Sequence, residues 1–150
     1  MIKDLIVKKI DKFSDERGWL GEIFREDEGA FHPAMSYLSV TRPGYVRGPH
    51  EHTAQSDFFV FMGPGDFELH LWDNRKKSPT KGEYLKIAVG EKNPSSVIVP
   101  PGVVHGYKNI SAVDAYCVNL PDKLYKGADK KEAVDEIRHE QDSNSPFKIV

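Results

Sequence analysis

Short apolar runs with a period of two recur along the first four-fifths of the chain, separated by turns rich in glycine and proline. Every second side chain of an extended strand points to the same face, so such alternation predicts strands. The predicted strands cover residues 20–24, 36–40, 57–62, 66–72, 85–89, 97–99 and 115–120. The intervals between them are too short for the crossover helices of a parallel sheet. The pattern therefore predicts an all-β sandwich or barrel.

One late segment, 129–141, departs from the strand pattern. Its apolar residues Ala133, Val134 and Ile137 lie three or four positions apart, with charged residues elsewhere. This spacing is typical of an amphipathic helix, so we expect a short C-terminal helix.

Composition narrows the class of protein. A chain of 150 residues has room for one hydrophobic core without disulfides, and the single cysteine, Cys117, excludes a disulfide framework. With 21 basic and 23 acidic side chains, the formal net charge of -2 gives no reason to expect a nucleic-acid partner. No apolar run approaches the roughly 20 residues that a membrane-spanning helix needs. Charged residues interrupt the first ten residues, which argues against a secretory signal. We expect a cytoplasmic protein without a membrane partner.

Three histidines and one aspartate follow turns in a pattern that indicates a site. His50 and His52 are two residues apart, so on a strand their imidazoles point the same way, and Asp57 begins the next apolar run. His105 follows a Pro-Pro-Gly turn later in the chain. Imidazoles combined with a carboxylate suit either a divalent metal or proton transfer.

These blocks resemble the two-part signature of the cupins, with Asp57 at a position where cupins usually have glutamate. Cupins are small jelly-roll barrels (double-stranded β-helices), which agrees with the strand pattern. The resemblance implies that residues 1–150 form a single cupin domain, all-β, with the short helix at its C-terminal end.

Longer blocks resemble one cupin family, the dTDP-4-dehydrorhamnose 3,5-epimerases. The similar blocks, in the same order as in that family, are Asp-Glu-Arg-Gly-Trp-Leu-Gly-Glu at 15–22, Val-Arg-Gly-Pro-His at 46–50, Asp-Asn-Arg at 73–75, Ser-Pro-Thr-Lys-Gly at 78–82 and Pro-Gly-Val-Val-His-Gly-Tyr at 101–107. The family removes protons from C3 and C5 of a 4-keto-6-deoxy sugar carried on a nucleoside diphosphate, without a metal or organic cofactor. Its members are homodimers, and the strongly apolar run 57–62 also favours a homodimer.

The resemblance also implies roles for individual residues. The implied catalytic residues are His50 as general base, His105 beside it, Tyr116 as the acid on the opposite face, and Asp142 as the acid that orients the base; the implied substrate-binding residues are Arg17, Glu22, Arg47 and Gln55. An imidazole suits removal of a proton next to a ketone near neutral pH, and a guanidinium binds a diphosphate in a bidentate manner. Tyr107 and Tyr125 are further candidates for the acid.

Asp57 departs from the epimerase pattern, because the family has a lysine there that meets the keto oxygen. A carboxylate cannot stabilise an enolate oxygen unless it holds a metal. One alternative is therefore a metal-dependent cupin enzyme that binds iron, manganese or zinc through His50, His52, Asp57 and His105. A second alternative is a non-catalytic protein that binds sugar nucleotides.

Overall fold

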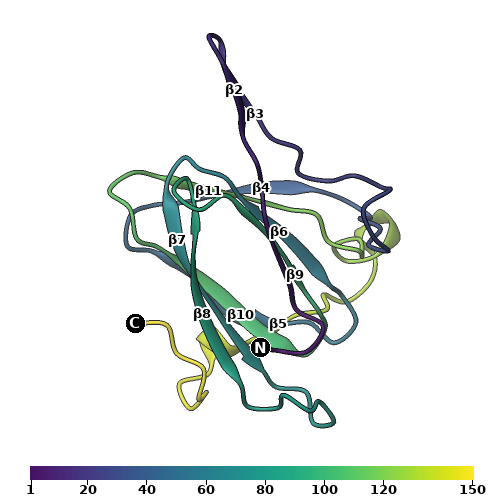
Figure 1. Ribbon diagram of the computed structural model, residues 1–150. Helices are drawn as coiled ribbons and strands as arrows, with labels where there is room; N and C mark the ends of the chain where they lie inside the picture. Colours follow the sequence, from purple (N-terminus) through teal and green to yellow (C-terminus); the bar gives the residue numbers. More distant parts are fainter.

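The computed structural model covers residues 1–150, and its strands form two five-stranded antiparallel sheets and a small hairpin (Figure 1). The strands are β1 (Ile6–Lys9), β2 (Phe13–Asp15), β3 (Gly18–Leu20), β4 (Tyr37–Thr41), β5 (Val46–Glu51), β6 (Asp57–Phe61), β7 (Asp66–Asp73), β8 (Tyr84–Gly90), β9 (Ser95–Val99), β10 (Val103–Asn109), β11 (Ala115–Asn119) and β12 (Ile137–Arg138). The first sheet has the order β1-β9-β6-β11-β4 and the second β12-β5-β10-β7-β8. The two sheets enclose one interior, which confirms the predicted all-β jelly-roll barrel. The structure has no helix with the length and apolarity to cross a membrane.

Alternation along the strands builds the core and also positions the polar site. Phe67, Leu69 and Leu71 of β7 are fully buried, on the inner face that their spacing predicts. On β10, the same inner face carries first His105 and then Tyr107, whose ring packs against Phe67. The inner face of the barrel therefore changes from polar to apolar within two residues along this strand.

The apolar run that begins at Asp57 forms β6, which lies between β9 and β11 in the first sheet. All five residues of β6 are buried. The apolar side chains of β6 are thus buried within one chain, so this run gives no separate argument for a homodimer.

The predicted C-terminal helix is wrong. The segment contains two short 3-10 turns, η1 (Ala128–Lys130) and η2 (His139–Gln141), with β12 between them. Asp129 and Lys130 have φ angles of 55° and 58°, which an α-helix cannot contain. β12 pairs with β5 at the edge of the second sheet. Pairing with this edge therefore overrides a helical pattern that rests on only three apolar residues.

The alternation at 20–24 likewise does not produce a strand over its whole length. β3 ends at Leu20, and the chain continues as a loop in which Ile23 and Phe24 pack against a small apolar cluster that includes Phe58. The hairpin of β2 and β3 extends away from the barrel (Figure 1).

Asp73, at the end of β7, organises the connection from β7 to β8. Its buried carboxylate accepts hydrogen bonds from the Arg75 guanidinium at 2.9 Å, from Ser78 Oγ at 2.5 Å and from Thr80 Oγ1 at 2.6 Å. Arg75 also donates to the backbone oxygen of Lys3 at 2.6 Å. Burial opposes ionisation of Asp73, but the bonds from Arg75, Ser78 and Thr80 outweigh it and hold the pKa well below its usual range. The Asp-Asn-Arg and Ser-Pro-Thr motifs therefore serve stability here.

We expect the Asp73→Asn variant to lose about 2–3 kcal/mol of unfolding free energy at pH 7, because donors to a charged acceptor lose their partner. A lowered folded-state pKa stabilises the fold above about pH 4, and this contribution is lost as the pH falls further. Urea unfolding between pH 7 and pH 3 should therefore show a shallower acid loss in the variant than in wild type. Asp114→Asn, at an exposed position, is the control. Equal pH slopes in Asp73→Asn and wild type would contradict this assignment.

Candidate functional site

Four side chains from both sheets converge at one end of the barrel interior. His50 lies on β5, His52 directly follows β5, His105 lies on β10 and Asp57 begins β6. β5 and β10 are paired with His50 opposite His105, and β6 brings Asp57 from the facing sheet. One donor atom from each of the four residues lies within 4.8 Å of the others. The structure therefore brings together the residues that the sequence pattern singles out.

Gly48 allows β5 and β10 to approach closely beside this cluster. Its φ is 81°, and a Cβ at this position would lie 2.7 Å from the backbone oxygen of His105. Only glycine avoids both the left-handed strain and this contact. The Arg-Gly-x-His block therefore needs its glycine to place His50 beside His105.

Asp57 is the centre of the cluster and is almost fully buried. Its Oδ1 accepts hydrogen bonds from Gln55 Nε2 at 2.9 Å and from Asn119 Nδ2 at 2.8 Å. Its Oδ2 lies 3.0 Å from His52 Nε2 and 3.1 Å from His105 Nε2. Burial disfavours the carboxylate, but the contacts with His105 and His52 outweigh burial and hold the pKa of Asp57 well below its usual range.

Backbone carbonyls fix the tautomers of two imidazoles. Nδ1 of His52 contacts the carbonyl oxygen of Asp135, and Nδ1 of His105 lies 3.0 Å from that of Val103. A carbonyl oxygen only accepts, so both Nδ1 atoms carry hydrogen and both Nε2 atoms face Asp57. His105 Nε2 is buried and, despite its 3.1 Å distance from Asp57, lacks the alignment of a hydrogen bond. Burial opposes protonation of His52, but the bond to Asp57 and its charge raise the pKa to about 9.

His50 has different surroundings. Its ring stands edge-on to His105, with 4.6 Å between ring centroids, and its Nδ1 lies 3.7 Å from Glu136 Oε1. Burial, followed by the charges of His105 and His52, lowers the pKa of His50 to about 2. The imidazole is therefore neutral near pH 7, and one ring nitrogen keeps a lone pair that can accept a proton.

A cavity of about 850 Å³ opens beside His50 and His52, within the usual size range of small-molecule sites. Residues 121–138 run from the end of β11 to β12 (Figure 1), and we call this segment the cavity cover because many of its side chains line one side of the cavity. The polar side chains that line the cavity include Tyr37, Gln55, Lys123, Tyr125, Lys126, Lys130, Glu136 and Arg138. The cavity thus offers cations, hydroxyl groups and imidazoles to one ligand.

Asp135, in the cavity cover, holds the loop that follows His52. Its carboxylate accepts hydrogen bonds from Thr53 N at 2.8 Å, Thr53 Oγ1 at 2.5 Å, Ala54 N at 2.9 Å and Gln55 N at 2.9 Å. These bonds lower the pKa of Asp135 to about 2, against the opposing effect of burial. Sequence reasoning missed Asp135, Glu136 and Asn119. The adjacent acids Asp135 and Glu136 were a usable sequence signal of functional residues, but the helix prediction obscured it. No sequence signal points to Asn119.

Two implied catalytic residues do not reach the cluster. Tyr116 lies on the outer face of the first sheet, because β11 alternates and its neighbours Cys117 and Ala115 face the core. Asp142 lies in an exposed turn, where its carboxylate accepts a hydrogen bond from the backbone N–H of Asn144 at 2.9 Å. Glu136 occupies the place beside His50 that Asp142 was expected to fill.

The implied phosphate-binding arginines also lie away from the cavity. Arg17 is exposed at the far end of the hairpin and pairs with Asp15 at 2.5 Å. The guanidinium of Arg47 donates to the carbonyl oxygen of Val40 at 2.7 Å and to Thr41 Oγ1 at 3.0 Å. Within one chain, the cations that line the cavity come from the cavity cover instead.

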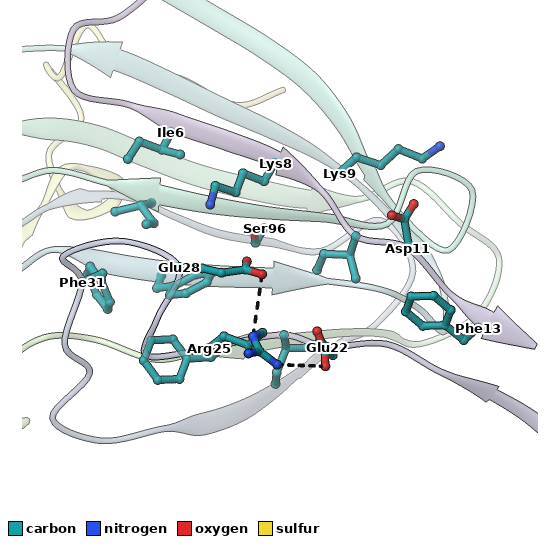
Figure 2. A pocket seen from close by; sticks show the side chains of 15 residues that line it. Ile6, Lys8, Lys9, Asp11, Phe13, Glu22, Arg25, Glu28, Phe31 and Ser96 are labelled. Atoms are coloured by element: carbon teal, nitrogen blue, oxygen red, sulfur yellow. Dashed lines mark ion pairs between the residues drawn. The ribbon is translucent and has the colours of Figure 1, made fainter.

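A second cavity, of about 200 Å³, contains Glu22 and lies apart from the histidines (Figure 2). Figure 2 shows Arg25 between Glu22 and Glu28, and the ion-pair distances are 3.6 and 3.8 Å. No histidine lines this cavity. Within one chain, Glu22, which the resemblance implies to bind substrate, therefore lies apart from the cavity that holds His50.

Comparison with known proteins places the chain in a family. The sequence profile described as dTDP-4-dehydrorhamnose 3,5-epimerase matches residues 1–138. The probable low-salt glycan biosynthesis epimerase Agl13 of Haloferax volcanii is 37% identical over 134 residues, which are 87% of this chain and 85% of that protein.

Two solved structures are similar in fold. The dTDP sugar isomerase of Desulfovibrio desulfuricans has a TM-score of 0.85 and 23% identity, over 98% of this chain and 91% of its own. The 3,5-epimerase of Legionella pneumophila, solved in complex with dTDP-4-keto-L-rhamnose, has a TM-score of 0.76 and 21% identity, over 91% and 73%. These two structures agree in fold, and the profile match over residues 1–138 together with the 37% identity to the Haloferax protein shows that the chain belongs to the dTDP-4-dehydrorhamnose 3,5-epimerase family of sugar epimerases.

Proposed function

We propose that this protein epimerises a 4-keto-6-deoxy sugar carried on a nucleoside diphosphate, with His50 as the general base. The observation that carries this proposal is the position of His50, beside the large cavity and 3.7 Å from Glu136. His50 takes the proton from the carbon next to the ketone, and the electron pair of the C–H bond moves toward the carbonyl oxygen. Glu136 then stabilises the imidazolium that forms.

The substrate class is supported by the family and by the ligand of the Legionella enzyme. We assign the diphosphate to Lys123, Lys126 and Lys130, which line the cavity and carry the opposite charge. No organic cofactor enters this reaction, because the proton transfer needs only a base and an acid. We place the protein in the cytoplasm on the basis of its composition.

The test is incubation with dTDP-4-keto-6-deoxyglucose in deuterated buffer. Deuterium should appear at C3, C5 or both, as measured by NMR and mass spectrometry of the sugar. A protein that binds this nucleotide sugar but incorporates no deuterium would instead support the non-catalytic binding protein.

The acid that returns the proton is expected among the two tyrosines that line the cavity, Tyr37 and Tyr125. Tyr37 is connected to the cluster, because Asn119 Nδ2 donates to its hydroxyl at 2.9 Å and to Asp57 at 2.8 Å. Replacing the acid with phenylalanine should preserve deuterium exchange but reduce epimer formation roughly 10²-fold or more. Tyr116→Phe, on the outer face, is the control and should keep both rates. Full epimer formation in both cavity variants would place the acid elsewhere.

We expect a homodimer in which β4, an edge strand of the first sheet, meets a second copy. Leu38 and Val40 on this strand are 58% and 38% exposed, and Trp19 on the projecting hairpin is 52% exposed. An apolar edge of this kind is a site for pairing with another chain. Light scattering should give the mass of a dimer for wild type and of a monomer for Leu38→Lys. A monomeric wild type at micromolar concentration would contradict the dimer.

A further inference from the structure

We propose that Glu51 and His139, which meet on the outer face of the second sheet, hold Glu136 beside the general base His50. Glu136 directly precedes β12 and His139 directly follows it, so a contact that fixes one end of this two-residue strand also fixes the other. Neither Glu51 nor His139 lines the large cavity, so both are positioning residues that act through Glu136. The catalytic part of this proposal rests on the proposed function.

Glu51 is a buried acid on the side of β5 that faces away from the cluster. It lies between His50 and His52 in the sequence, so alternation turns its side chain to the opposite face of the sheet. Glutamate is almost never fully buried unless it is paired, yet this residue is only 7% exposed. Its carboxylate accepts hydrogen bonds from Asn74 Nδ2 at 3.1 and 3.2 Å and lies 3.3 Å from His139 Nε2. These two contacts offset the cost of burying the acid.

His139 is oriented by contacts at both ring nitrogens. Its Nε2 is buried and lacks the alignment of a hydrogen bond, so its contact with Glu51 is electrostatic. A lone pair on Nε2 would face the carboxylate and be repelled, so Nε2 carries hydrogen. On the other side of the ring, Nδ1 lies 3.4 Å from Ser145 Oγ. Removal of the imidazole would therefore leave Glu51 buried with Asn74 as its remaining partner, which is costly for a charged acceptor.

The residues that follow β12 cover this contact and cross the outer face of the second sheet. Phe147 packs against His139 and against Trp72 of β7, with 4.8 and 5.7 Å between ring centroids. Ile149 lies against β10, because a Cβ on Gly106 would be 2.7 Å from its Cδ1. The segment thus contacts β5, β10 and β7, and His139 is the contact nearest to β12.

β12 connects the outer contact to the base. It pairs with the last two residues of β5, Glu51 and His50, and it is shorter than most strands. Its register therefore depends on the contacts at its two ends. A shift by one residue would turn Glu136 to the other face of the sheet, away from His50 Nδ1, from which its Oε1 is now 3.7 Å. The contact of His139 with Glu51 opposes such a shift.

The test measures kcat and KM for deuterium exchange with dTDP-4-keto-6-deoxyglucose in Glu51→Gln and His139→Gln, alone and combined with Glu136→Gln. Each single variant should lower kcat roughly tenfold with KM changed less than about twofold, because misplaced groups slow the chemical step. Neither should lower kcat further when Glu136→Gln is already present, because both act through that carboxylate. His70→Gln is the matched control, since His70 pairs with Glu68 at 2.9 Å on the outer side of β7, and it should keep the kcat of wild type.

Amide hydrogen exchange provides a readout that is independent of activity. The amides of β12 should exchange faster in Glu51→Gln and His139→Gln than in wild type or His70→Gln. Unchanged protection of β12 in both variants would overturn the contact as the device that fixes this strand. An unchanged kcat, or a loss that adds in full to that of Glu136→Gln, would overturn the positioning role. If wild type shows no deuterium exchange into the sugar, the proposed function fails, and faster amide exchange of β12 still supports the structural half of the proposal.

Discussion

Replacing His50 with alanine is expected to slow deuterium exchange at C3 and C5 by roughly 10²–10⁴-fold, the usual effect of losing a positioned general base. The effect should fall mainly on kcat, because His50 is one of many residues that line the cavity and the lysines of the cavity cover remain. The measurement is the initial rate of deuterium incorporation, at saturating and at low concentrations of the nucleotide sugar. Exchange that survives unchanged in His50→Ala would move the base elsewhere, with His105 the next candidate.

A pair of carboxylate variants makes this prediction sharper. Glu136→Gln keeps the size of the side chain that lies 3.7 Å from His50 but removes its charge, so kcat should fall while KM changes little. Asp142→Asn, in an exposed turn, should behave as wild type. A lower kcat in Asp142→Asn, with an unchanged kcat in Glu136→Gln, would instead support Asp142 as the acid that orients the base, as the family resemblance implies.

Local pattern predicted an all-β fold and the common direction of His50 and His52, whereas the choice of a jelly-roll barrel came from the resemblance to cupins. Alternation places Phe67, Leu69 and Leu71 in the core, and the same rule puts His50 and His52 on a common side. The period-two signal is reliable here because one face of each long strand meets a single shared interior. By contrast, the helical spacing at 129–141 rests on only three apolar residues. Pairing of β12 with β5 replaces the predicted helix.

The remaining part of the site could not be predicted, because it depends on contacts between residues far apart in the sequence. Asn119 on β11 donates a hydrogen bond to Asp57 on the neighbouring strand β6. Asp135, in the cavity cover, accepts hydrogen bonds from the loop at Thr53. The adjacent acids Asp135 and Glu136 mark a polar segment in the sequence, but neither residue type nor spacing predicts which distant residues such side chains contact. The blocks that carry the family resemblance do not all lie at the cluster, since the one around Asp73 holds the connection from β7 to β8 and Arg17 lies on the projecting hairpin.

We expect the Asp135→Ala variant to lose both unfolding free energy and deuterium exchange activity. Its carboxylate is the acceptor for Thr53, Ala54 and Gln55, and because this loop is largely exposed, removing it should cost about 1–3 kcal/mol of unfolding free energy. The freed loop no longer holds Gln55 against Asp57, and the backbone carbonyl that fixes the tautomer of His52 can shift. Exchange activity should therefore fall about 100-fold in protein that is still folded.

Hydrogen exchange of the backbone distinguishes this local effect from general unfolding. In Asp135→Ala, the amides of Thr53, Ala54 and Gln55 should lose protection at temperatures where the amides of β6 and β10 remain protected. Asp129→Asn is the control, because Asp129 lines the same cavity from the same cover but pairs only with Lys131, at 3.5 Å on the surface, and asparagine tolerates its φ of 55°. Asp135→Asn keeps one acceptor oxygen and should recover part of the protection. If these amides stay protected in Asp135→Ala, the loop is held by other contacts, and the activity of that variant should then match wild type.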